Sequence, residues 1–523
     1  MLAASSNIQG LTQAALWILA LGVLIFLGYF SLSQRTSRLP LPPGPPGLFI
    51  LGNVSEIARS HAWIAYRDYA AKYGDVISLN ALGHSFVILN IHSAALDLLE
   101  KRSSIYSDRP ANIMTQLTGW DWTLALKRYG EDWRRVRRPF WQHFHSNAVK
   151  QYEPAQQLEA RRFLRRLLNV PEDLDTELKS LLAKMICAVV HGVHMEDEQA
   201  LYYSRVLTEA EVGFSEVFRP GSFFVEFLPW LQHVPAWFPG TGWQKKVQIW
   251  RGQADVMLDD PYNLAKDAMK RGVALPSMLS RLLEHSSDVT GKKGGGEERV
   301  IKETTSVAYG AAIDTTSVTI LSFFCAMLLH PSVQARAQAE LDRIVGPDRP
   351  PEHADRASLP YIRALVKESL RWHNVGPLGI AHRCMQEDTY RGWRIPEGAI
   401  VLPNIWAMLH DPEVYPEPDA FRPERFLTPD ESELNPNVPN PSSIAFGYGR
   451  RICPGRHFAE DVLFITIASI LHVFDIVPAL DAHGRSISVE LKATSGFISH
   501  VEHFAYSVRP RSNAAEALIQ GEV

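Results

Sequence analysis

Hydrophobic residues recur at helical spacing along most of the chain, and alternation of apolar and polar residues is confined to short stretches. The stretch 63–74, WIAYRDYAAKYG, has the pattern of a helix that ends at a glycine. The stretch 75–90 predicts two short strands joined by a turn at Gly83. Helical periodicity then dominates as far as about residue 373. The pattern predicts one mainly α domain with small β-sheets over 51–523.

The last part of the chain has a different pattern. Residues 373–451 are proline-rich and irregular, with strand-like pieces such as GAIVLPN at 398–404. An apolar helix over 455–473 is expected to close the core. The glycine-rich stretch 291–298 predicts a flexible loop inside the helical region, because its glycines lack the spacing of a phosphate-binding loop.

The N-terminal region contains an uncharged run of 20 residues, 11–30. As a helix it is long enough to cross a hydrocarbon core of about 30 Å. The first charged residue is Arg35, so no basic region precedes the run as it would in a cleaved signal peptide. We therefore expect a single transmembrane anchor within 1–33, with a buried soluble helix as the alternative. Arg35 and Arg38 favour a cytosolic position for the following domain.

Two further segments bear on the membrane. The stretch RLPLPPGPPG at 38–47 predicts a semi-rigid polyproline linker over 34–50. The segment 223–240, FFVEFLPWLQHVPAWFPG, is rich in aromatic residues. Two interpretations of this segment are open, since apolar patches at membranes and in cores look alike in sequence. It either enters the bilayer beside a substrate entrance or packs against the domain.

Charge and cysteine content exclude several classes of protein. The net charge is −4 and no basic block is sustained, which argues against a nucleic-acid-binding protein. Cysteines occur only at 187, 325, 384 and 453. That scattered usage indicates a reducing compartment rather than a disulfide scaffold, and the absence of a Cys-x-x-Cys pair argues against structural zinc.

The stretch 446–455, FGYGRRICPG, places Cys453 among glycines, arginines and a proline. A thiolate is a soft ligand, and a single cysteine can be the axial ligand of a haem iron. Glycines allow the backbone to approach a flat macrocycle, and the positive end of the following helix favours a thiolate. Arg451 can pair with a haem propionate, and Phe446 can shield the sulfur from water.

Five positions of this stretch match the pattern F-x-x-G-x-R-x-C-x-G, and they are Phe446, Gly449, Arg451, Cys453 and Gly455. The stretch resembles the haem-binding loop of the cytochrome P450 superfamily, the haem-thiolate monooxygenases. The resemblance extends over roughly 38–510. It implies a cytochrome P450-like fold and a haem b whose iron binds the Cys453 thiolate.

The stretch AAIDTT at 311–316 resembles the oxygen-activation motif of the same superfamily. There an acid–alcohol pair relays protons, and Asp314 and Thr315 match that pair. We expect the Thr315 hydroxyl to bond the carbonyl of Ala311, four residues earlier. Ala312 stands where the family usually has glycine. The alternative interpretation is an aspartate and two threonines inside a helix with no catalytic role.

Two further motifs imply contacts to the haem propionates. Trp133 and Arg137 in WRRVRR share a helical face and resemble the propionate-binding helix of the family. Arg383, in GIAHRC, matches another propionate-binding position. For the two arginines, a solvated surface charge is the alternative.

A charged cluster is expected to be structural rather than catalytic. In ESLR, Glu368 and Arg371 lie on one helical face. The resemblance implies that this pair is buried and joined by Arg425 of PERF, which would hold the cysteine loop in place.

Substrate contacts in the family map onto 110–126, 309–312, 374–380 and 494–499. The apolar residues in or directly beside these ranges are Trp120, Trp122, Ile313, Leu378 and Phe497. They imply an apolar organic substrate, aromatic or terpenoid, although packing in the core explains these residues equally well. Details such as YSDRP look most like fungal microsomal members in secondary metabolite biosynthesis and xenobiotic oxidation.

The chain has no dinucleotide fingerprint, so electrons must come from another protein. The resemblance implies an NADPH–cytochrome P450 reductase, with O2 as co-substrate, at the endoplasmic reticulum membrane. Four arginines have two possible interpretations, and they are Arg134, Arg138, Arg450 and Arg456. They form either a basic docking patch for the reductase or a solvated basic face.

Two other functions remain open. One is a haem-thiolate isomerase or dehydratase that uses no external O2, and Asp314 with Thr315 argues against it. The other is a non-catalytic haem-binding sensor or carrier.

Overall fold

The structure is a computed structural model. It describes residues 39–49, 51–57, 60–169, 174–218, 223–226, 228–290 and 295–521. The predicted transmembrane segment 11–30 lies outside these residues.

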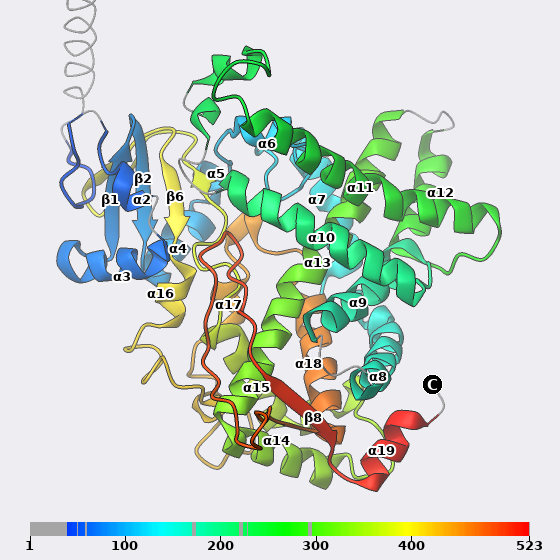
Figure 1. Cartoon of the computed structure of the whole chain (residues 1–523). Coiled ribbons are helices and arrows are strands. Elements are labelled where there is room, and N and C mark those ends of the chain that lie inside the picture. The colour runs from blue at the N-terminus through cyan, green and yellow to red at the C-terminus, as the bar shows by residue number, and fades with distance from the viewer. Residues whose placement is uncertain are drawn as a thin grey trace, which may run out of the picture.

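Helices make up most of the described chain, as the hydrophobic pattern predicts (Figure 1). The longer helices are α3 (Ala62–Tyr73), α7 (Glu131–Phe144), α8 (Glu153–Asn169), α9 (Leu174–Ile186), α10 (Asp197–Phe218), α11 (Trp243–Lys270), α12 (Met278–Thr290), α13 (Gly295–Leu329), α14 (Pro331–Ile344), α15 (Pro360–Trp372) and α18 (Arg456–Val473). The shorter ones are α2 (Val54–Ile57), α4 (His92–Ala95), α5 (Ser103–Tyr106), α6 (Ile113–Leu117), α16 (Ile405–Leu409), α17 (Ser442–Ala445) and α19 (Asn513–Gln520).

The strands form three small sheets. The largest has the order β1-β2-β6-β3, and the others pair β4 with β5 and β7 with β8. Their bounds are β1 (Val76–Ala81), β2 (His84–Leu89), β3 (His382–Arg383), β4 (Asp388–Tyr390), β5 (Trp393–Ile395), β6 (Ile400–Pro403), β7 (Phe474–Pro478) and β8 (Tyr506–Pro510).

The hairpin predicted around Gly83 is confirmed. Strands β1 and β2 pair antiparallel with Ala81 opposite His84, and the two turn residues between them are Leu82 and Gly83. Their φ angles are 49° and 84°, the left-handed geometry that suits a two-residue hairpin turn. Strand β6 then adds in parallel to β2, so a strand late in the chain completes the first sheet.

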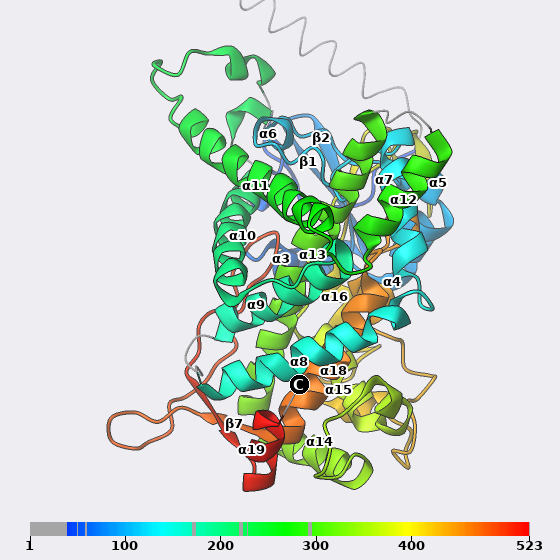
Figure 2. The ribbon, with the colours of Figure 1, turned by 90° about the vertical axis from the view of Figure 1, so that its right-hand side faces the viewer.

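Helix α13 crosses the molecule between the other helices (Figures 1 and 2). Residues Gly296–Leu329 are long and apolar enough to span a membrane, but 78% of the most apolar window is buried inside the protein. We therefore assign α13 as a core helix. It begins at Gly295, so the described end of the predicted 291–298 loop is helical. Glu297 and Glu298 lie in its first turn, where the helix dipole favours acidic side chains.

The described part of the proline-rich linker is fixed to the domain. The backbone N–H of Ser78 donates to the Pro43 carbonyl oxygen at 2.9 Å, and the Ser78 hydroxyl donates to that of Pro42. The N–H of Arg394 donates to the Pro40 carbonyl at 2.7 Å. This segment therefore does not act as a free spacer, because its carbonyls satisfy donors of β1 and β5.

The predicted structural cluster is confirmed. Arg371 Nε and Nη2 donate to the two carboxylate oxygens of Glu368 at 2.7 and 2.8 Å, and both side chains are fully buried. Arg425 Nε lies 3.2 Å from Glu368 Oε1. Arg371 also donates to the carbonyls of Leu409 and Ala420, so the cluster joins α15 to two later segments of the chain.

Candidate active site

The cysteine loop is closed by a backbone hydrogen bond. The N–H of Cys453 donates to the carbonyl of Phe446 at 2.8 Å. Gly447 and Gly449 both have positive φ, 77° and 56°. A Cβ atom on Gly449 would lie 2.2 Å from the carbonyl oxygen of Leu99. Glycine is therefore required at 449 both for its backbone angle and for its close approach to the neighbouring segment.

The Cys453 sulfur is surrounded by donors and positive charge. It accepts from the N–H groups of Gly455 and Arg456, at the start of α18, and Arg137 and Arg456 place positive charge nearby. Burial raises the pKa of the Cys453 thiol, while these dipoles and charges lower it. The site therefore keeps an unligated thiol protonated but has donors in place for a thiolate.

Arg451 lies beside the indole of Trp133, with its guanidinium carbon 4.6 Å from the ring centre. It donates to the carbonyls of Ser107 and Lys127 at 2.7 and 2.8 Å. Burial is the main cause that lowers the pKa of Arg451 to about 9, and the nearby charge of Arg137 adds to it. A buried guanidinium whose pKa falls in this way is stabilised by an anion.

Arg137 and Arg383 lie in different surroundings. Arg137 Nη2 donates to the carbonyl of Ile452 at 2.6 Å, and burial lowers its pKa to about 10. Trp133 is buried on the same face of α7, as predicted. Arg383 is partly exposed, and its Nη1 lies 3.2 Å from Asp108 Oδ2. Arg383 thus already has a carboxylate partner, unlike Arg137.

Arg109 is a buried cation that the sequence analysis missed. Its guanidinium donates to the carbonyls of Ala125, Ile380 and Ala381 at 2.7–2.8 Å. Burial and the charge of Arg451 lower its pKa well below its usual range. The only available signal was the YSDRP stretch, in which one arginine among polar residues gives no indication of burial.

The AAIDTT motif lies in the middle of α13. Thr315 Oγ1 donates to the carbonyl of Ala311 at 2.8 Å, as predicted from the spacing. Thr315 and Ala312 are partly exposed, whereas Ile313 is fully buried in the core. Ile313 lies about 160° around the helix from Thr315 and therefore on a different face, and its contact with substrate stays a prediction.

Comparison with known proteins identifies the family. A family model described as Cytochrome P450 matches residues 42–491.

This chain belongs to the cytochrome P450 family.

Its curated relatives include the cytochrome P450 monooxygenase claR of Ampulloclitocybe clavipes, 39% identical over 99% of this chain and 94% of the relative. The cytochrome P450 monooxygenase 208 of Postia placenta is 39% identical over 97% of this chain and 96% of its own. The tryptamine 4-monooxygenase of Psilocybe cyanescens is 36% identical over 94% and 97%. The chain is therefore a fungal-type haem-thiolate monooxygenase, which acts on an organic substrate with O2 and a redox partner.

The residues of this P450 fit a haem. Cys453 offers a sulfur donor with positive surroundings, and the glycines beside it leave room for a macrocycle. In the described part of the chain, the side chains of Arg109, Arg137 and Arg451 donate to backbone carbonyls and pair with no carboxylate. Two propionates would supply the missing negative charge. When bound, the haem provides the iron centre at which O2 is activated.

Asp314 does not contact the Thr315 hydroxyl. Its carboxylate instead lies 2.9 Å from Nε2 of His500, a residue of the C-terminal segment. Glu211 of α10 approaches the same imidazole nitrogen at 3.8 Å. Neither His500 nor Glu211 could be predicted from the sequence, because no local pattern links them to α13.

Aromatic side chains from three separate segments meet in this P450. The rings of Trp120 and Trp122 are 5.6 Å apart, and Phe214 of α10 lies 5.3 Å from Trp120. Phe497 lies 5.4 Å from Phe214 and 5.3 Å from Phe218. Phe214 therefore links Trp120 and Trp122 to Phe497, and the contact of these residues with substrate stays a prediction. Leu378 packs elsewhere, against the β1–β2 sheet.

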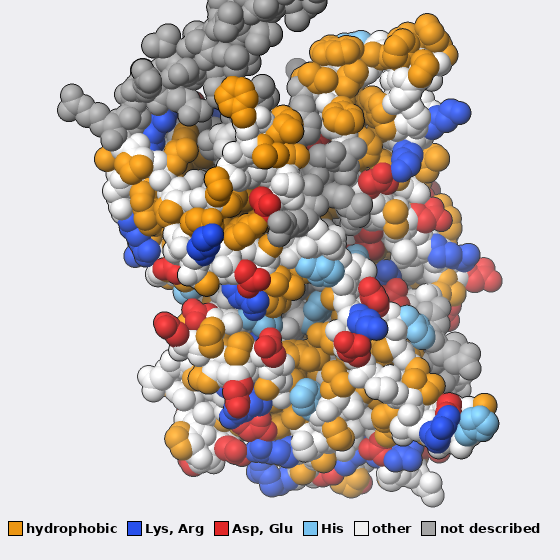
Figure 3. Space-filling model, turned by 60° about the vertical axis from the view of Figure 1, so that its left-hand side comes forward, with side chains coloured by type: hydrophobic (Ala, Val, Ile, Leu, Met, Phe, Trp, Pro, Cys, Tyr) orange, Lys and Arg blue, Asp and Glu red, His pale blue; other side chains and the backbone are white. Residues whose placement is uncertain are grey.

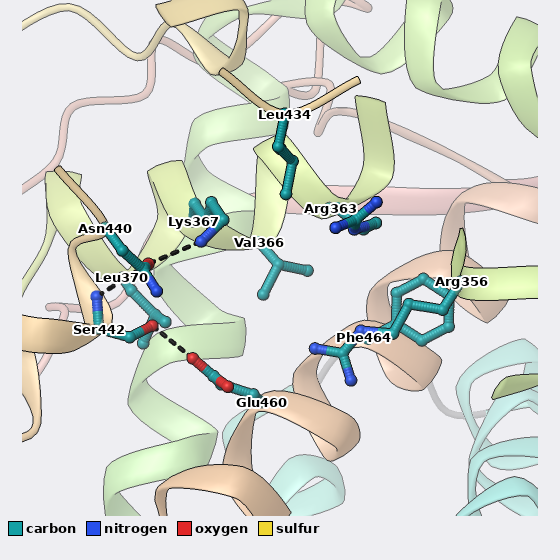
Figure 4. A pocket seen from close by; sticks show the side chains of 10 residues that line it. All are labelled: Arg356, Arg363, Val366, Lys367, Leu370, Leu434, Asn440, Ser442, Glu460 and Phe464. Atoms are coloured by element: carbon teal, nitrogen blue, oxygen red, sulfur yellow. Dashed lines mark hydrogen bonds between the residues drawn. The ribbon is translucent and has the colours of Figure 1, made fainter. Parts of the chain in front are cut away.

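A cavity of about 280 Å³ lies between α15 and α18 (Figure 4). Its lining is mixed, with the apolar side chains of Val366, Leu370, Leu434 and Phe464 beside basic and polar ones. Lys367 donates to Asn440, and Ser442 donates to Glu460. Neither the cysteine loop nor the 311–316 motif contributes to this cavity, so we do not assign it to the P450 substrate.

Proposed function

We propose that this P450 is a membrane-anchored monooxygenase that inserts one oxygen atom of O2 into an apolar organic substrate, using electrons from an NADPH-dependent reductase. The observation that carries the proposal is the position of Thr315, whose hydroxyl lies on the accessible side of α13 and donates to Ala311. With its proton engaged there, the oxygen keeps lone pairs free to accept from water. An isomerase that uses no external O2 has no need of this arrangement.

The residues have distinct roles in this proposal. Cys453 holds the iron, while Arg137, Arg451 and Arg109 hold the propionates. The overall reaction consumes O2, two electrons and two protons, and it yields the oxygenated product and water. Thr315 orders water at the reacting centre, and Asp314 supplies protons to that water. Arg383, which already pairs with Asp108, supports the propionates less directly.

The substrate is best described as apolar and aromatic or terpenoid. The aromatic cluster of Trp120, Phe214, Phe218 and Phe497 offers ring faces and edges and no charge. One relative is named as a tryptamine 4-monooxygenase, which supports an aromatic substrate of modest size. Secondary metabolism is the setting that these features favour.

The exposed aromatic residues support contact with a membrane. The described residues of 223–240 lie at the same end of the molecule as residues 48 and 49 (Figure 1), and Figure 3 shows hydrophobic side chains gathered at this end. Trp237 is 81% exposed, which argues against packing on the domain. Exposed apolar side chains at this end are Leu48, Phe49, Leu51, Phe224, Trp230, Trp237 and Phe238. We propose that this face rests on the endoplasmic reticulum membrane beside the predicted anchor.

The basic residues of α7 and the cysteine loop support a docking surface for the reductase. The guanidinium groups of Arg134 and Arg450 lie 5.7 and 5.4 Å from the ring of Tyr129. Arg134, Arg138 and Arg450 are exposed. Cations held near an aromatic ring beside the thiolate would attract an acidic flavin domain through long-range electrostatics.

The test is reconstitution of the full-length P450 with an NADPH–cytochrome P450 reductase in vesicles. A screen for substrate-induced shifts of the haem spectrum across terpenoids, polyketides and polycyclic aromatics would choose the substrate. We expect NADPH-dependent O2 consumption and one labelled oxygen atom in the product under 18O2. Product formed without O2 would support an isomerase or dehydratase, and binding without turnover of any ligand would support a sensor.

A further inference from the structure

His500 lies between two carboxylates that belong to different helices. Its Nε2 is 2.9 and 3.1 Å from the two carboxylate oxygens of Asp314 on α13. The same nitrogen is 3.8 Å from Glu211 Oε2 on α10. Burial and the Asp314 carboxylate raise the pKa of Glu211 well above its usual range, which favours the protonated form of Glu211.

The three side chains differ in their access to water. The Asp314 side chain is 4% exposed, that of Glu211 is 14% exposed, and that of His500 is 29% exposed. Accessibility thus increases in steps from the acid of the 311–316 motif to the imidazole. A proton that reaches Asp314 from this side meets His500 first.

A buried lysine and a second histidine lie close to these three side chains. Lys179 of α9 is buried, 3.8 Å from Glu211 and 3.2 Å from Asp175. It supplies a permanent positive charge, so the acidic groups do not depend on a charged His500 for balance. His373 is also near, and its Nε2 contacts the carbonyl of Ser499 at 2.8 Å.

The backbone of the 494–500 segment holds the imidazole in position. The N–H of Thr494 donates to the carbonyl of His500 at 2.8 Å, and the N–H of His500 donates to the Thr494 hydroxyl at 3.0 Å. The N–H of Ser499 donates to the carbonyl of Val375 at 2.9 Å. Figure 1 shows this C-terminal segment running along the molecule toward α10. Phe497 in its turn packs on Phe214, so the same segment contacts the aromatic cluster.

We propose that His500 is the residue through which protons from solvent reach Asp314 during turnover. The proposal rests on the proposed function, because it requires that Asp314 and Thr315 deliver protons for O2 reduction. His500 belongs to the C-terminal segment, 186 positions from Asp314. Its role is to donate to the acid, and it does not contact the reacting atoms.

The proton transfer balances without any other reactant. The charged imidazole gives its Nε2 proton to Asp314, so that an O–H bond forms as the N–H bond breaks. Asp314 then passes this proton toward water near Thr315. The neutral imidazole regains a proton at Nε2 from Glu211 or from water, and solvent restores any proton that Glu211 has given. One proton has then moved inward and every group has its starting charge.

The main test compares His500→Gln with His503→Gln in the full-length enzyme, with reductase and NADPH. Glutamine keeps a hydrogen-bonding side chain but cannot titrate, and His503 is an exposed histidine of the same segment. We expect product formed per NADPH to fall roughly tenfold in His500→Gln, with peroxide rising in step; this is less than a full general-acid effect because water can partly replace the imidazole. His503→Gln should match the wild type.

The pH dependence separates proton transfer from a structural role. In the wild type, product per NADPH should vary with pH, because an imidazole exchanges a proton with solvent and a glutamine amide does not. In His500→Gln this variation should disappear, while haem content and the substrate-induced spectral shift stay unchanged. A uniform loss of product at all pH values, or a loss of haem, would show that His500 only supports the fold and would overturn the proposal.

A measurement independent of turnover completes the test. In protein with isotope-labelled histidine, the imidazole resonance that disappears in His500→Gln is assigned to His500. That resonance should shift in Asp314→Asn, because the carboxylate that contacts Nε2 is replaced by an amide. An unchanged resonance would contradict the contact. If Thr315→Ala uncouples product from NADPH but His500→Gln does not, this inference fails and the proposed function stands. If Thr315→Ala leaves coupling intact, both fail.

Discussion

Replacement of Glu368 by glutamine is predicted to destabilise this P450 strongly, although it only replaces one carboxylate oxygen by an NH2 group. Glu368 accepts from Arg371 Nε and Nη2, from Arg425 Nε and from the backbone N–H of Arg422. Glutamine keeps the size of the side chain but turns one acceptor into a donor that faces a guanidinium. Two arginines, 0% and 6% exposed, would then lie in the core without a counter-charge.

The expected loss follows from that burial. Removing one partner of a buried ion pair costs about 3–5 kcal/mol, because the remaining charge stays desolvated. Arg425→Met should cost less, about 1–3 kcal/mol, since the Glu368–Arg371 pair survives. The variant loses the 3.2 Å contact to Glu368 and the hydrogen bonds to the carbonyls of Pro416, Glu417 and Ala420. The matched control is Asp68→Asn, in the exposed Arg67–Asp68 pair, which should change stability by less than about 0.5 kcal/mol.

The assay is urea unfolding, followed by far-ultraviolet circular dichroism and by the absorbance of the thiolate-ligated haem. The three variants are compared by their transition midpoints at equal slope. The order of loss should be Glu368→Gln, then Arg425→Met, then Asp68→Asn. If Glu368→Gln unfolds at the same urea concentration as Asp68→Asn, the cluster does not hold the fold together and the reasoning from burial is refuted.

Three other predictions test the proposed site and its partners. Cys453→Ala should remove the thiolate-type shifted Soret band of the reduced carbon monoxide complex, and persistence of that band would mean that another residue ligates the iron. Reversal of Arg134 and Arg138 to Glu should slow reductase-driven turnover, most at low salt, while peroxide-driven turnover stays nearly constant; equal losses by both routes would assign the arginines to the fold or the haem. Deletion of 1–33 should move the protein toward the soluble fraction with its haem retained, and Trp237→Ser in that variant should further lower its sedimentation with vesicles; a full-length protein that is already soluble would contradict the anchor.

Local sequence determined the features that depend on neighbours in the chain. The β1–β2 hairpin follows from Gly83 and the alternation around it, and α3 ends where Gly74 adopts positive φ. The Thr315 hydroxyl reaches Ala311 because residues four apart lie one above the other on a helix. The cysteine loop is equally local, since the Phe446–Cys453 hydrogen bond spans seven residues. Family resemblance supplied the haem and the buried cluster around Glu368, which spacing alone could not.

Tertiary structure decided which side chains meet across the chain. Helix α13 is buried on nearly all sides, so its apolar residues do not mark one buried face. Periodicity therefore could not predict the burial of Ile313 or the direction of the Asp314 side chain. The partner of Asp314 is His500, which only the packing of the C-terminal segment against α10 and α13 brings near. The sequence around Arg109 is typical of an exposed loop arginine, whereas in the structure its guanidinium donates to three backbone carbonyls. Long-range contacts of this kind depend on how the helices pack against one another, and the spacing of residues along the chain does not predict this packing.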